Sequence, residues 1–433
     1  MKWTAQQDTA LSKMADFIRD PNQMMFRLWG EAGTGKTTLA AEIRDRFDHL
    51  TFIALAYTGK AASRLRQKGW NNSGTIHSHL YIPGSKCRAR ITEMLERRME
   101  IDNALKGDTD PLHPDVIFEL TPEERADLHA EDEDLAKKIL VEEEALKSPM
   151  FVLNTETDLV DYKVIVLDEV SMVGKEGQDL EKLCREHRIK LILMGDPYQL
   201  PPVKSTAHFM SAKPDYQLTD VQRQSKDDPI LWLAHRARSR ESIPLGSYGL
   251  SKVVERIPTP DHSFHPEQLA EMIECDQLLC GTNNTRMYCN QVMRAARGYK
   301  EKLEVGEKLV CLANSKQGFF NGSIWYCQDI LEEQPERDRV VVSLSSDDPM
   351  EEDRIAKIHN RSLMGQEVHF TERSGAECMV SAQALTVHKF QGSEGRHIMI
   401  LDESYTARED SHRWLYTALT RAQERLTLVQ SRK

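Results

Sequence analysis

The chain has 433 residues, which suggests two to four domains, and its 40% hydrophobic and 29% charged content excludes a fibrous or disordered protein. No apolar run reaches about 18 residues and "MKWTAQQDTA" lacks a signal-peptide core, so we expect a soluble intracellular, by default cytoplasmic, protein. The eight cysteines form no C-x-x-C pair, which excludes common zinc spacings and indicates reduced thiols.

The net charge of −11 argues only superficially against a nucleic-acid partner. Residues 121–146 hold ten acidic and three basic residues, which is −7 and leaves −4 for the remainder of the chain. A basic groove can exist on such a surface, so the composition leaves nucleic acid open as a partner.

The first part of the chain alternates predicted helices and apolar strands. Thr4 to Ile18 carries an apolar stripe at helical spacing, with Thr4 as its N-cap. Apolar strands are expected at "MFRLWG" (25–30), "TFIALAYTG" (51–59), "KVIVLDE" (163–169) and "IKLILMGD" (189–196). This alternation predicts an α/β fold with a doubly wound parallel sheet, whose ligands lie at the carboxyl ends of the strands.

Residues 81–160 interrupt the alternation and are interpreted as an insertion. Thr121, Pro122 and Glu124 form the capping box of a long, charged helix. Its acidic run is interpreted as a solvated helix face, with repulsion or guidance of a polyanion as the alternative.

A second α/β lobe is expected after residue 210, because "DQLLCGTNN" (276–284) and "HIMILDES" (397–404) again look like buried strands. Between about 301 and 381, short strands with turn signals predict a small β-barrel. These five strands are "EKLVCLA", "SIWYCQDI", "DRVVVSL", "QEVHF" and "CMVSAQ".

The segment "GEAGTGKT", Gly30 to Thr37, matches the phosphate-binding pattern G-x-x-x-x-G-K-[ST]. Backbone N–H groups of this loop can surround a β-phosphate at a helix N-terminus, Lys36 can contact the β and γ oxygens, and Thr37 can ligate Mg²⁺. We therefore expect ATP and Mg²⁺ as cofactors. The candidate nucleotide-binding residues in the loop are Gly33, Thr34, Gly35, Lys36, Thr37 and Thr38.

Asp168 and Glu169 follow a buried strand, where an acidic pair is costly to leave unpartnered. Asp168 can hold the Mg²⁺ shell, and Glu169 can orient or deprotonate an attacking water. Together with the glycine loop, this pair favours nucleotide hydrolysis over transfer of the phosphoryl group to a metabolite.

Gln7 has two interpretations. The spacing Thr4-x-x-Gln7 is itself a capping box, in which the glutamine only satisfies the Thr4 backbone. Alternatively its amide reads the edge of the adenine base, which we favour because the helix leads straight into the strand before the glycine loop.

The order of these and further motifs resembles superfamily 1 helicases of the RecD and Dda type. The motifs, which run from residue 7 to residue 422, are "QDTAL", "GEAGTGKTT", "AYTGKAA", "TIHS", "VLDEVSM", "GDPYQLPPV", "LTDVQRQ", "TVHKFQGSE" and "YTALTRA". The resemblance implies two RecA-like lobes that hold single-stranded DNA across their tops and ATP between them. It also implies a bacterial or phage-infected host cytoplasm.

Several site residues are implied by matching these motifs. Arg421, in "LYTALTRAQ", would extend from the second lobe to the γ-phosphate as an arginine finger, alongside Arg223 in "LTDVQRQ". The alternative for either arginine is a bond to nearby carbonyls. Gln199 would couple the γ-phosphate to the DNA channel, and Glu394 matches a position that contacts the ribose. These residues complete a catalytic set with Lys36 and Glu169.

The resemblance also implies DNA contacts through hydroxyls and backbone N–H groups, which position a strand without reading its sequence. The first-lobe candidates are Thr58, Gly59, Lys60, Thr75 and His77, and the second-lobe candidates are Thr386, His388 and Lys389. A solvated or core histidine is the alternative for both histidines.

The β-strand segment looks like the SH3-like insertion of this family, in which Phe319, Phe320 and Trp325 could stack on bases, although barrel packing is the favoured role of Trp325. The first insertion departs from the family, which has a compact duplex-splitting hairpin at this place. No strand-separating wedge can be chosen from Phe118, Phe151 and Tyr81.

The expected domains are a first lobe at 1–210 interrupted by 81–160, a second lobe at 211–300 plus 382–433, and an SH3-like insertion at 301–381.

The expected function is a DNA helicase that moves 5′ to 3′, with the direction taken from the resemblance only. Alternatives are a translocase that displaces proteins but unwinds poorly, and a non-catalytic DNA-binding partner subunit. Expected partners are single-stranded and forked DNA, with single-stranded-DNA-binding or replisome proteins as candidates and a monomer as the expected state; the residues leave RNA open.

Overall fold

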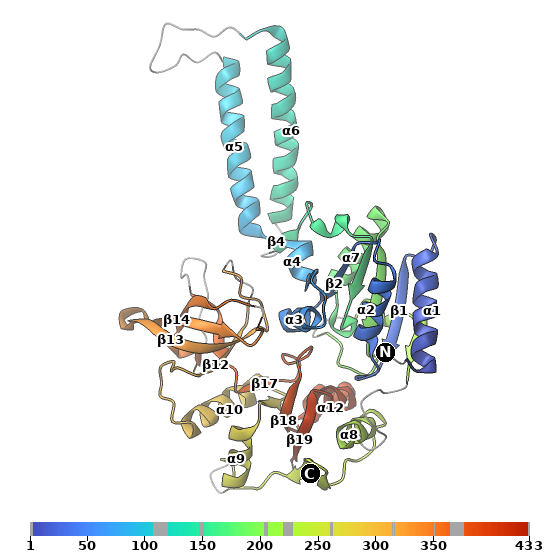
Figure 1. The fold of residues 1–433 in the computed structure, drawn as a ribbon. Helices are drawn as coiled ribbons and strands as arrows, with labels where there is room; N and C mark the ends of the chain where they lie inside the picture. The colour runs from blue at the N-terminus through green and yellow to red at the C-terminus, as the bar shows by residue number, and fades with distance from the viewer. Residues whose placement is uncertain are drawn as a thin grey trace. The chain divides into compact units, whose positions relative to one another are not determined.

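The computed structural model describes residues 3–106, 120–146, 151–202, 207–219, 228–259, 263–313, 315, 317–349, 351–363 and 376–431 (Figure 1). The chain forms two compact units. The larger consists of Met1–Thr75 and Val160–Lys433, and the smaller of Ile76–Leu159. The larger unit is α/β, with two lobes that are each built on a six-stranded sheet, as the alternation of predicted elements indicates.

The first lobe contains a fully parallel sheet with strand order β3-β2-β6-β7-β1-β8. Its strands are β1 (Met25–Gly30), β2 (Phe52–Ala56), β3 (Ser73–Thr75), β6 (Val164–Leu167), β7 (Lys190–Gly195) and β8 (Tyr216–Leu218). The four apolar strands predicted from the sequence are confirmed as β1, β2, β6 and β7. Every residue of β2 and β6 is buried, as expected for parallel strands that are covered on both faces.

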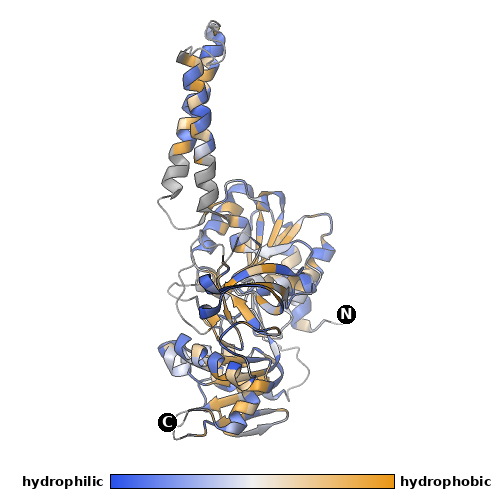
Figure 2. Ribbon diagram, turned by 90° about the vertical axis from the view of Figure 1, so that its left-hand side faces the viewer, coloured by the Kyte–Doolittle hydropathy of each residue, from blue (hydrophilic) through white to orange (hydrophobic). Residues whose placement is uncertain are grey.

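Three helices of the first lobe enclose an apolar core with this sheet: α1 (Ala5–Arg19), α2 (Lys36–Arg46) and α3 (Gly59–Gln67). Helix α7 (Glu176–His187) contributes none of its residues to that core. The predicted first helix is confirmed, and Thr4 is its N-cap. Figure 2 shows the contrast between the hydrophobic sheet strands and the mixed colouring of the helices.

The second lobe is built on a sheet with strand order β17-β11-β18-β19-β10-β9, which is parallel except for its edge strand β9. Its strands are β9 (Gly246–Tyr248), β10 (Ser251–Glu255), β11 (Gln277–Cys280), β17 (Ala384–Thr386), β18 (Gly395–Leu401) and β19 (Ala422–Gln430). Its helices are α8 (Pro229–Arg238), α9 (Pro266–Glu274), α10 (Asn283–Ala296) and α12 (Ser411–Leu419). The two strands predicted here are confirmed as β11 and β18.

A five-stranded antiparallel sheet is inserted into the second lobe, with strand order β15-β14-β13-β12-β16. Its elements are β12 (Lys308–Cys311), β13 (Ile324–Gln334), β14 (Arg339–Ser346), β15 (Arg354–His359), α11 (Asn360–Leu363) and β16 (Met379–Ser381). The predicted strand "QEVHF" lies outside the described residues, whereas β15 was not predicted because charged residues interrupt its apolar alternation.

The aromatic residues of this insertion have different environments. Phe319 and Trp325 are 0% and 1% exposed and pack edge to face with ring centroids 4.8 Å apart. Both rings therefore belong to the core of the insertion, so the suggested stacking of Phe319 on bases is wrong for this arrangement. Phe320 is only half-buried and lies beside Gly59 of the first lobe.

The smaller unit is helix-rich, as predicted. It contains α4 (Ile76–Leu80), β4 (Tyr81–Pro83), α5 (Gly84–Lys106), α6 (Pro122–Leu146) and β5 (Phe151–Leu153). The capping box of α6 is confirmed, because the Thr121 backbone N–H donates to Glu124 at 2.9 Å and the Glu124 N–H donates to the Thr121 hydroxyl at 3.3 Å. Ion pairs of Arg97 with Glu131 and of Arg98 with Asp132 join the two long helices.

The described residues also bear on two further expectations, the absence of a membrane span and the choice of a strand-separating wedge. In the described part of the chain, no helix has both the length and the apolar character that a membrane crossing requires. Phe118, one of the three wedge candidates, lies outside the described residues, and the Tyr81 ring packs at a tilt of 34° against His77, with ring centroids 5.5 Å apart.

Candidate active site between the two lobes

The glycine loop connects β1 to α2 and has the conformation that its glycines permit. Gly33 and Gly35 have φ of 79° and 88°, in the left-handed region, and Gly35 is the N-cap of α2. A Cβ at Gly35 would lie 2.8 Å from Nε2 of Gln7 and would displace that amide, while the φ itself favours glycine there. Nζ of Lys36 donates to the carbonyls of Gly30 at 2.6 Å and Glu31 at 3.0 Å. The loop thus curls around an ammonium group at a helix N-terminus, which is an anion-binding arrangement.

Gln7 combines two contacts. Its side chain accepts from the Thr4 backbone at 3.2 Å, and Thr4 accepts in return at 3.3 Å, so the capping interpretation is confirmed. Its amide nitrogen also donates to the carbonyl of Thr34 at 3.2 Å. Gln7 therefore ties α1 to the glycine loop, and contact with an adenine base stays a prediction.

Thr37 and Asp168 lie together at the carboxyl end of the first sheet. The Thr37 hydroxyl donates to Oδ2 of Asp168 at 3.1 Å, which brings the two oxygen ligands predicted for Mg²⁺ into one place. A hydroxyl beside a carboxylate fits the preference of Mg²⁺ for one or two protein oxygens with the remaining positions filled by water and phosphate.

Glu169 is the next residue and has an unusual backbone. Its φ of 56° and ψ of 42° place a non-glycine residue in the left-handed region, a conformation that costs about 1–3 kcal/mol and is found at functional sites. Burial raises the pKa of the Glu169 carboxyl, and the Arg421 guanidinium partly opposes this shift. The fold therefore holds an acid here at a cost in free energy.

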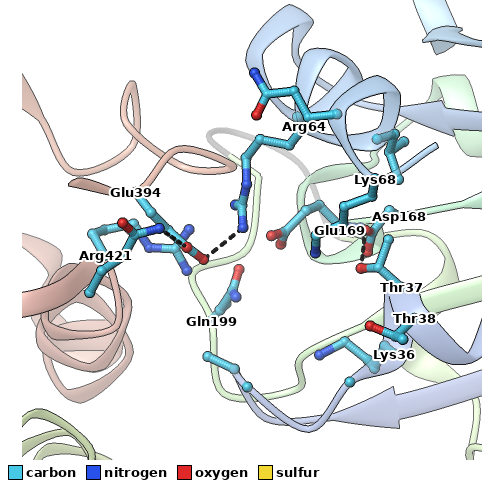
Figure 3. A pocket seen from close by; sticks show the side chains of 17 residues that line it. Lys36, Thr37, Thr38, Arg64, Lys68, Asp168, Glu169, Gln199, Glu394 and Arg421 are labelled. Carbon is cyan, nitrogen blue, oxygen red and sulfur yellow. Dashed lines mark hydrogen bonds and ion pairs between the residues drawn. The ribbon is translucent and has the colours of Figure 1, made fainter. Parts of the chain in front are cut away.

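These residues line a cavity of about 560 Å³ that both lobes form (Figure 3). The first lobe contributes the glycine loop, α3, the acidic pair and Gln199, and the second contributes Glu394, Arg421 and Gln423. Lys36 and Arg421, which are 385 residues apart in the sequence, thus face the same space.

Arg421 is 2% exposed and follows the C-terminus of α12. Its guanidinium donates to the carbonyls of Thr417 at 3.0 Å and Ser393 at 3.2 Å, and to the hydroxyl of Thr420 at 3.2 Å. Local bonds therefore hold the arginine, as the alternative interpretation proposes, while it also lines the cavity.

Gln199 lies between the two lobes. With its amide nitrogen toward Glu169, it donates to Oε2 of that residue at 3.0 Å and its oxygen accepts from Nη2 of Arg421 at 3.3 Å. One amide thus connects the acid of the first lobe to the arginine of the second.

Sequence reasoning missed two cations of the cavity, Arg64 and Lys68, although both lie in the segment that begins with "AYTGKAA". Arg64 forms an ion pair with Glu394 at 2.9 Å and donates to the carbonyl of Gly392 at 3.2 Å. Burial lowers the pKa of Lys68, and the charge of Arg64 adds to this effect. The missed signal is the helical spacing of Ala61, Arg64, Leu65 and Lys68, which puts them on one face of α3.

The structure brings several of the first-lobe DNA candidates next to the second lobe. Thr58 caps α3 by accepting from the Ala61 N–H at 3.2 Å, and a Cβ built on Gly392 of the second lobe would lie 3.0 Å from its hydroxyl. Lys60 forms an ion pair with Asp347 of the β insertion. Thr75 is the last residue of β3, and His77 belongs to α4 of the smaller unit.

The second-lobe candidates surround the end of β17. The Thr386 hydroxyl accepts from the Lys389 N–H at 3.3 Å, and Lys389 donates to the side chain of Asn321. Burial lowers the pKa of His388, so its imidazole is neutral near pH 7. Arg223 lies outside the described residues.

Family models match most of the chain. An AAA domain matches residues 3–243, and a UvrD-like helicase C-terminal domain matches residues 381–429. An uncharacterized protein of Acanthamoeba polyphaga mimivirus is 29% identical over 206 residues, which cover 46% of this chain and 33% of that protein. The match thus spans about a third of the curated relative's length.

Solved structures with a similar fold are Pif1 helicases. One of them is a structure described as a basis for DNA unwinding at forked double-stranded DNA by two coordinating Pif1 helicases. It has a TM-score of 0.52 and 17% identity to this chain, and the match covers 99% of this chain and 92% of that one. Bacteroides Pif1 in complex with ADP-AlF3 and single-stranded DNA gives a TM-score of 0.50 at 17% identity, with the same coverage. At this identity the likeness shows the fold. The chain belongs to the AAA domain family, whose model matches more than half of it, and it also matches a UvrD-like helicase C-terminal domain at residues 381–429.

Proposed function

We propose that the chain hydrolyses ATP between its two lobes and uses the resulting closure to move 5′ to 3′ along single-stranded DNA and unwind duplex DNA. The observation that carries this proposal is the cavity of about 560 Å³, to which Lys36, Thr37, Asp168 and Glu169 come from one lobe and Arg421 from the other. The direction rests on the family resemblance alone.

In this proposal the first lobe binds the nucleotide phosphates. The glycine loop N–H groups and Lys36 bind the β and γ oxygens, and Thr37 and Asp168 hold Mg²⁺, their oxygens being 3.1 Å apart. Bound Mg²⁺ supplies charge neutralisation at the phosphates. Glu169 orients the attacking water and accepts its proton.

The second lobe completes the site. Arg421 stabilises the charge that develops on the γ-phosphate, a contribution of about 10³–10⁵ in rate for an arginine finger. Gln199, which bridges Glu169 and Arg421, reports the state of the γ-phosphate to the DNA channel. Glu394 contacts the ribose, Gln7 contacts the base, and Arg223 is proposed as a second finger.

Helix α3 offers a physical link between DNA and nucleotide. It begins beside Thr58, Gly59 and Lys60, which we propose contact the DNA backbone, and it carries Arg64 toward the ATP cavity. A shift of this one short helix would therefore change both sites together. Thr75, His77, Thr386, His388 and Lys389 are proposed as further DNA contacts.

We also propose the domain division given above, with lobes at 1–210 and 211–300 plus 382–433, a pin-region insertion at 81–160 and an SH3-like insertion at 301–381. The antiparallel sheet of 301–381 supports the last of these. The proposed partners are single-stranded and forked DNA, and single-stranded-DNA-binding or replisome proteins, in replication, recombination or repair. A monomer is proposed as the active state.

The test is to measure ATP hydrolysis with and without single-stranded DNA, and unwinding of substrates with 5′ or 3′ tails of DNA and RNA. We expect stimulation by single-stranded DNA of at least about tenfold, because DNA should help to close the lobes. We expect unwinding only from 5′ tails of DNA. Equal turnover with and without DNA would contradict the motor.

The helix-rich insertion, which replaces the compact hairpin of the family, favours a second candidate. This is a translocase that displaces bound proteins and unwinds poorly. A protein-displacement assay beside the forked-duplex assay separates the two, because displacement without unwinding supports the translocase. A chain that binds DNA but has no ATPase activity would instead be a non-catalytic partner subunit.

A further inference from the structure

A buried hydrogen bond joins the two lobes beside the proposed active site. The hydroxyl of Tyr416, on α12 of the second lobe, donates to Oδ2 of Asp196 at the end of β7 in the first lobe, at 2.8 Å. Tyr416 is 2% exposed and Asp196 is 1% exposed. A hydrogen bond to a charged group in such a place is among the stronger ones in proteins.

Each end of this bond lies close to a proposed catalytic residue in the sequence. Asp196 precedes Gln199 by three residues, and Tyr416 precedes Arg421 by five, with the C-terminal turn of α12 between them. Gln199 and Arg421 in turn meet at 3.3 Å. The Tyr416–Asp196 bond and the Gln199–Arg421 contact are therefore two ends of one short bridge between the lobes.

Other polar contacts bind the same two segments together. The Leu200 N–H donates to the Thr417 hydroxyl at 3.0 Å, and the Gln391 amide donates to the Leu200 carbonyl at 3.2 Å. The backbone of Tyr198 donates to the other carboxylate oxygen of Asp196 at 3.0 Å. One carboxylate oxygen is thus bonded to its own loop, and the other is bonded to the helix that leads to Arg421.

Because the Asp196 carboxylate is buried, its hydrogen bond with Tyr416 depends closely on where α12 lies. Burial raises the pKa of Asp196, and Lys36, Tyr198, Tyr416 and Arg421 act in the opposite direction. A buried charge is stable only while its partners stay in hydrogen-bonding geometry. A small displacement of α12 would leave this acid without its side-chain donor.

We infer that Tyr416 is a positioning residue for hydrolysis, whose hydroxyl fixes α12 against the Asp196 loop so that Arg421 meets the γ-phosphate. This inference rests on the proposed function, since it needs Arg421 to act on bound ATP. Tyr416 touches neither nucleotide nor DNA in this role; it sets where the arginine lies when the lobes close.

A packing role for the same residue has to be separated from this one. The Tyr416 ring belongs to the apolar core of the second lobe, and it lies edge to face with Tyr198, with centroids 6.1 Å apart. Tyr416→Phe keeps the ring and removes only the hydroxyl. Tyr198→Phe is the matched control, because it removes a hydroxyl from the neighbouring ring.

The experiment measures kcat and KM for ATP with saturating single-stranded DNA, together with the affinities for ADP and for ADP with aluminium fluoride. For Tyr416→Phe we expect kcat and the affinity for the fluoride complex to fall by roughly tenfold, the effect of one buried hydrogen bond to a charged group. KM and ADP affinity should stay unchanged, because the arginine that the bond positions acts on transition-state contacts. Tm should fall modestly, because the buried Asp196 carboxylate loses its side-chain donor. Tyr198→Phe should behave like the unmodified protein.

Asp196→Asn provides a second, independent arm. Because both side chains act through one bond, Tyr416→Phe should have little further effect on kcat in the Asp196→Asn background. Additive losses in the double variant would overturn the inference, as would unchanged kcat in Tyr416→Phe, or equal losses of kcat and of ADP affinity.

Arg421→Ala distinguishes failure of this inference from failure of the proposed function. If Arg421→Ala greatly lowers kcat while Tyr416→Phe is unchanged, only the inference fails. If Arg421→Ala keeps normal turnover, Arg421 is not a finger, and the proposed function and the inference fail together.

Discussion

Arg64 and Glu394 form an ion pair of 2.9 Å between the two lobes, at the wall of the cavity that we propose binds ATP. Arg64 comes from α3 of the first lobe, and Glu394 precedes β18 of the second. Their side chains are 27% and 15% exposed, so the pair is partly shielded from water and salt. Charge as well as apolar packing therefore holds the lobes together at this point.

Arg64→Ala should weaken ADP binding by several-fold. The substitution removes the cation that pairs with Glu394, to which the Gln423 amide also donates at 2.9 Å, and so increases the negative charge beside a site for a polyanion. Titration of ADP, followed by calorimetry or fluorescence, measures the change.

The double variant Arg64→Ala with Glu394→Gln is the control for this explanation. It removes the negative charge of Glu394 as well, so ADP affinity should recover toward that of the unmodified protein. An affinity that stays low in the double variant would show instead that Arg64 acts on the nucleotide itself.

Arg421→Ala should lower kcat by about 10³-fold or more, while ATP affinity changes little, because an arginine finger acts chiefly in the transition state. Single-turnover hydrolysis and nucleotide titration measure the two quantities. Arg413→Ala is a matched control on α12, the helix that leads to Arg421, since Arg413 is 39% exposed and pairs with Asp410 at 3.7 Å. Lost nucleotide binding with normal turnover at saturation would refute the finger.

Glu169 should set the acid limb of the pH profile. A proton-accepting carboxylate works only when ionised, and burial raises the pKa of Glu169, so kcat should begin to fall at a pH above the ordinary glutamate range of about 4.3. Measurement of kcat against pH at saturating ATP and DNA tests this. An acid limb at or below about 4.3 would contradict the assignment.

Glu169→Gln should have opposite effects on activity and stability. A carboxyl whose pKa is higher in the folded than in the unfolded chain stabilises the fold as pH falls and destabilises it when ionised. The amide removes that buried charge, so at neutral pH we expect a higher Tm together with strongly reduced kcat. A lower Tm would mean that attraction to Arg421 outweighs the cost of burial.

Gly392→Ala should impair both folding and the approach of the lobes. Gly392 has a φ of +76°, and a Cβ there would lie 3.0 Å from the Thr58 hydroxyl and 3.1 Å from the Ala61 Cβ. We expect a loss of about 1–3 kcal/mol of stability, from the backbone conformation, and reduced DNA-stimulated ATPase, from the contact across the lobes.

Gly298→Ala separates these two effects. Gly298 has a similar φ of +80°, but no atom lies within 4 Å of a Cβ built on it. It should lose stability like the other variant and keep its ATPase rate. Equal ATPase rates in both alanine variants would exclude a role for the Gly392–Thr58 contact.

The sequence predicted the buried parts of the fold better than its edges. Strands β2 and β6 are continuous apolar runs, so they were recognised, whereas β3 and β17 have only three residues each and give no periodic signal. Strand β15 was missed because its sequence, RIAKIH, does not alternate strictly between apolar and polar residues.

The site residues were predictable where a sequence motif fixes the backbone conformation. They were less predictable where a side chain meets its partner only through tertiary packing. The glycine loop places Lys36 by its local pattern alone. By contrast, the ion pair between Arg64 and Glu394 and the bond between Tyr416 and Asp196 join segments more than 200 residues apart. No spacing in the sequence encodes such pairs, since they exist only once both lobes have folded and met.

Two basic residues near the proposed DNA path, Lys60 and Arg66, already have anionic partners within the protein. Lys60 pairs with Asp347, and Arg66 pairs with Asp348 at 3.0 Å and Glu351 at 3.2 Å, all on the turn that follows β14. A DNA phosphate that binds Lys60 would take the place of the Asp347 carboxylate. The displaced carboxylate would then attract salt cations and keep them near the DNA. We therefore expect the affinity for DNA to depend less steeply on salt than the number of phosphate contacts implies. The same carboxylates compete with any polyanion that binds weakly to Lys60 or Arg66. A ligand displaces them only when it contacts several of these cations at once.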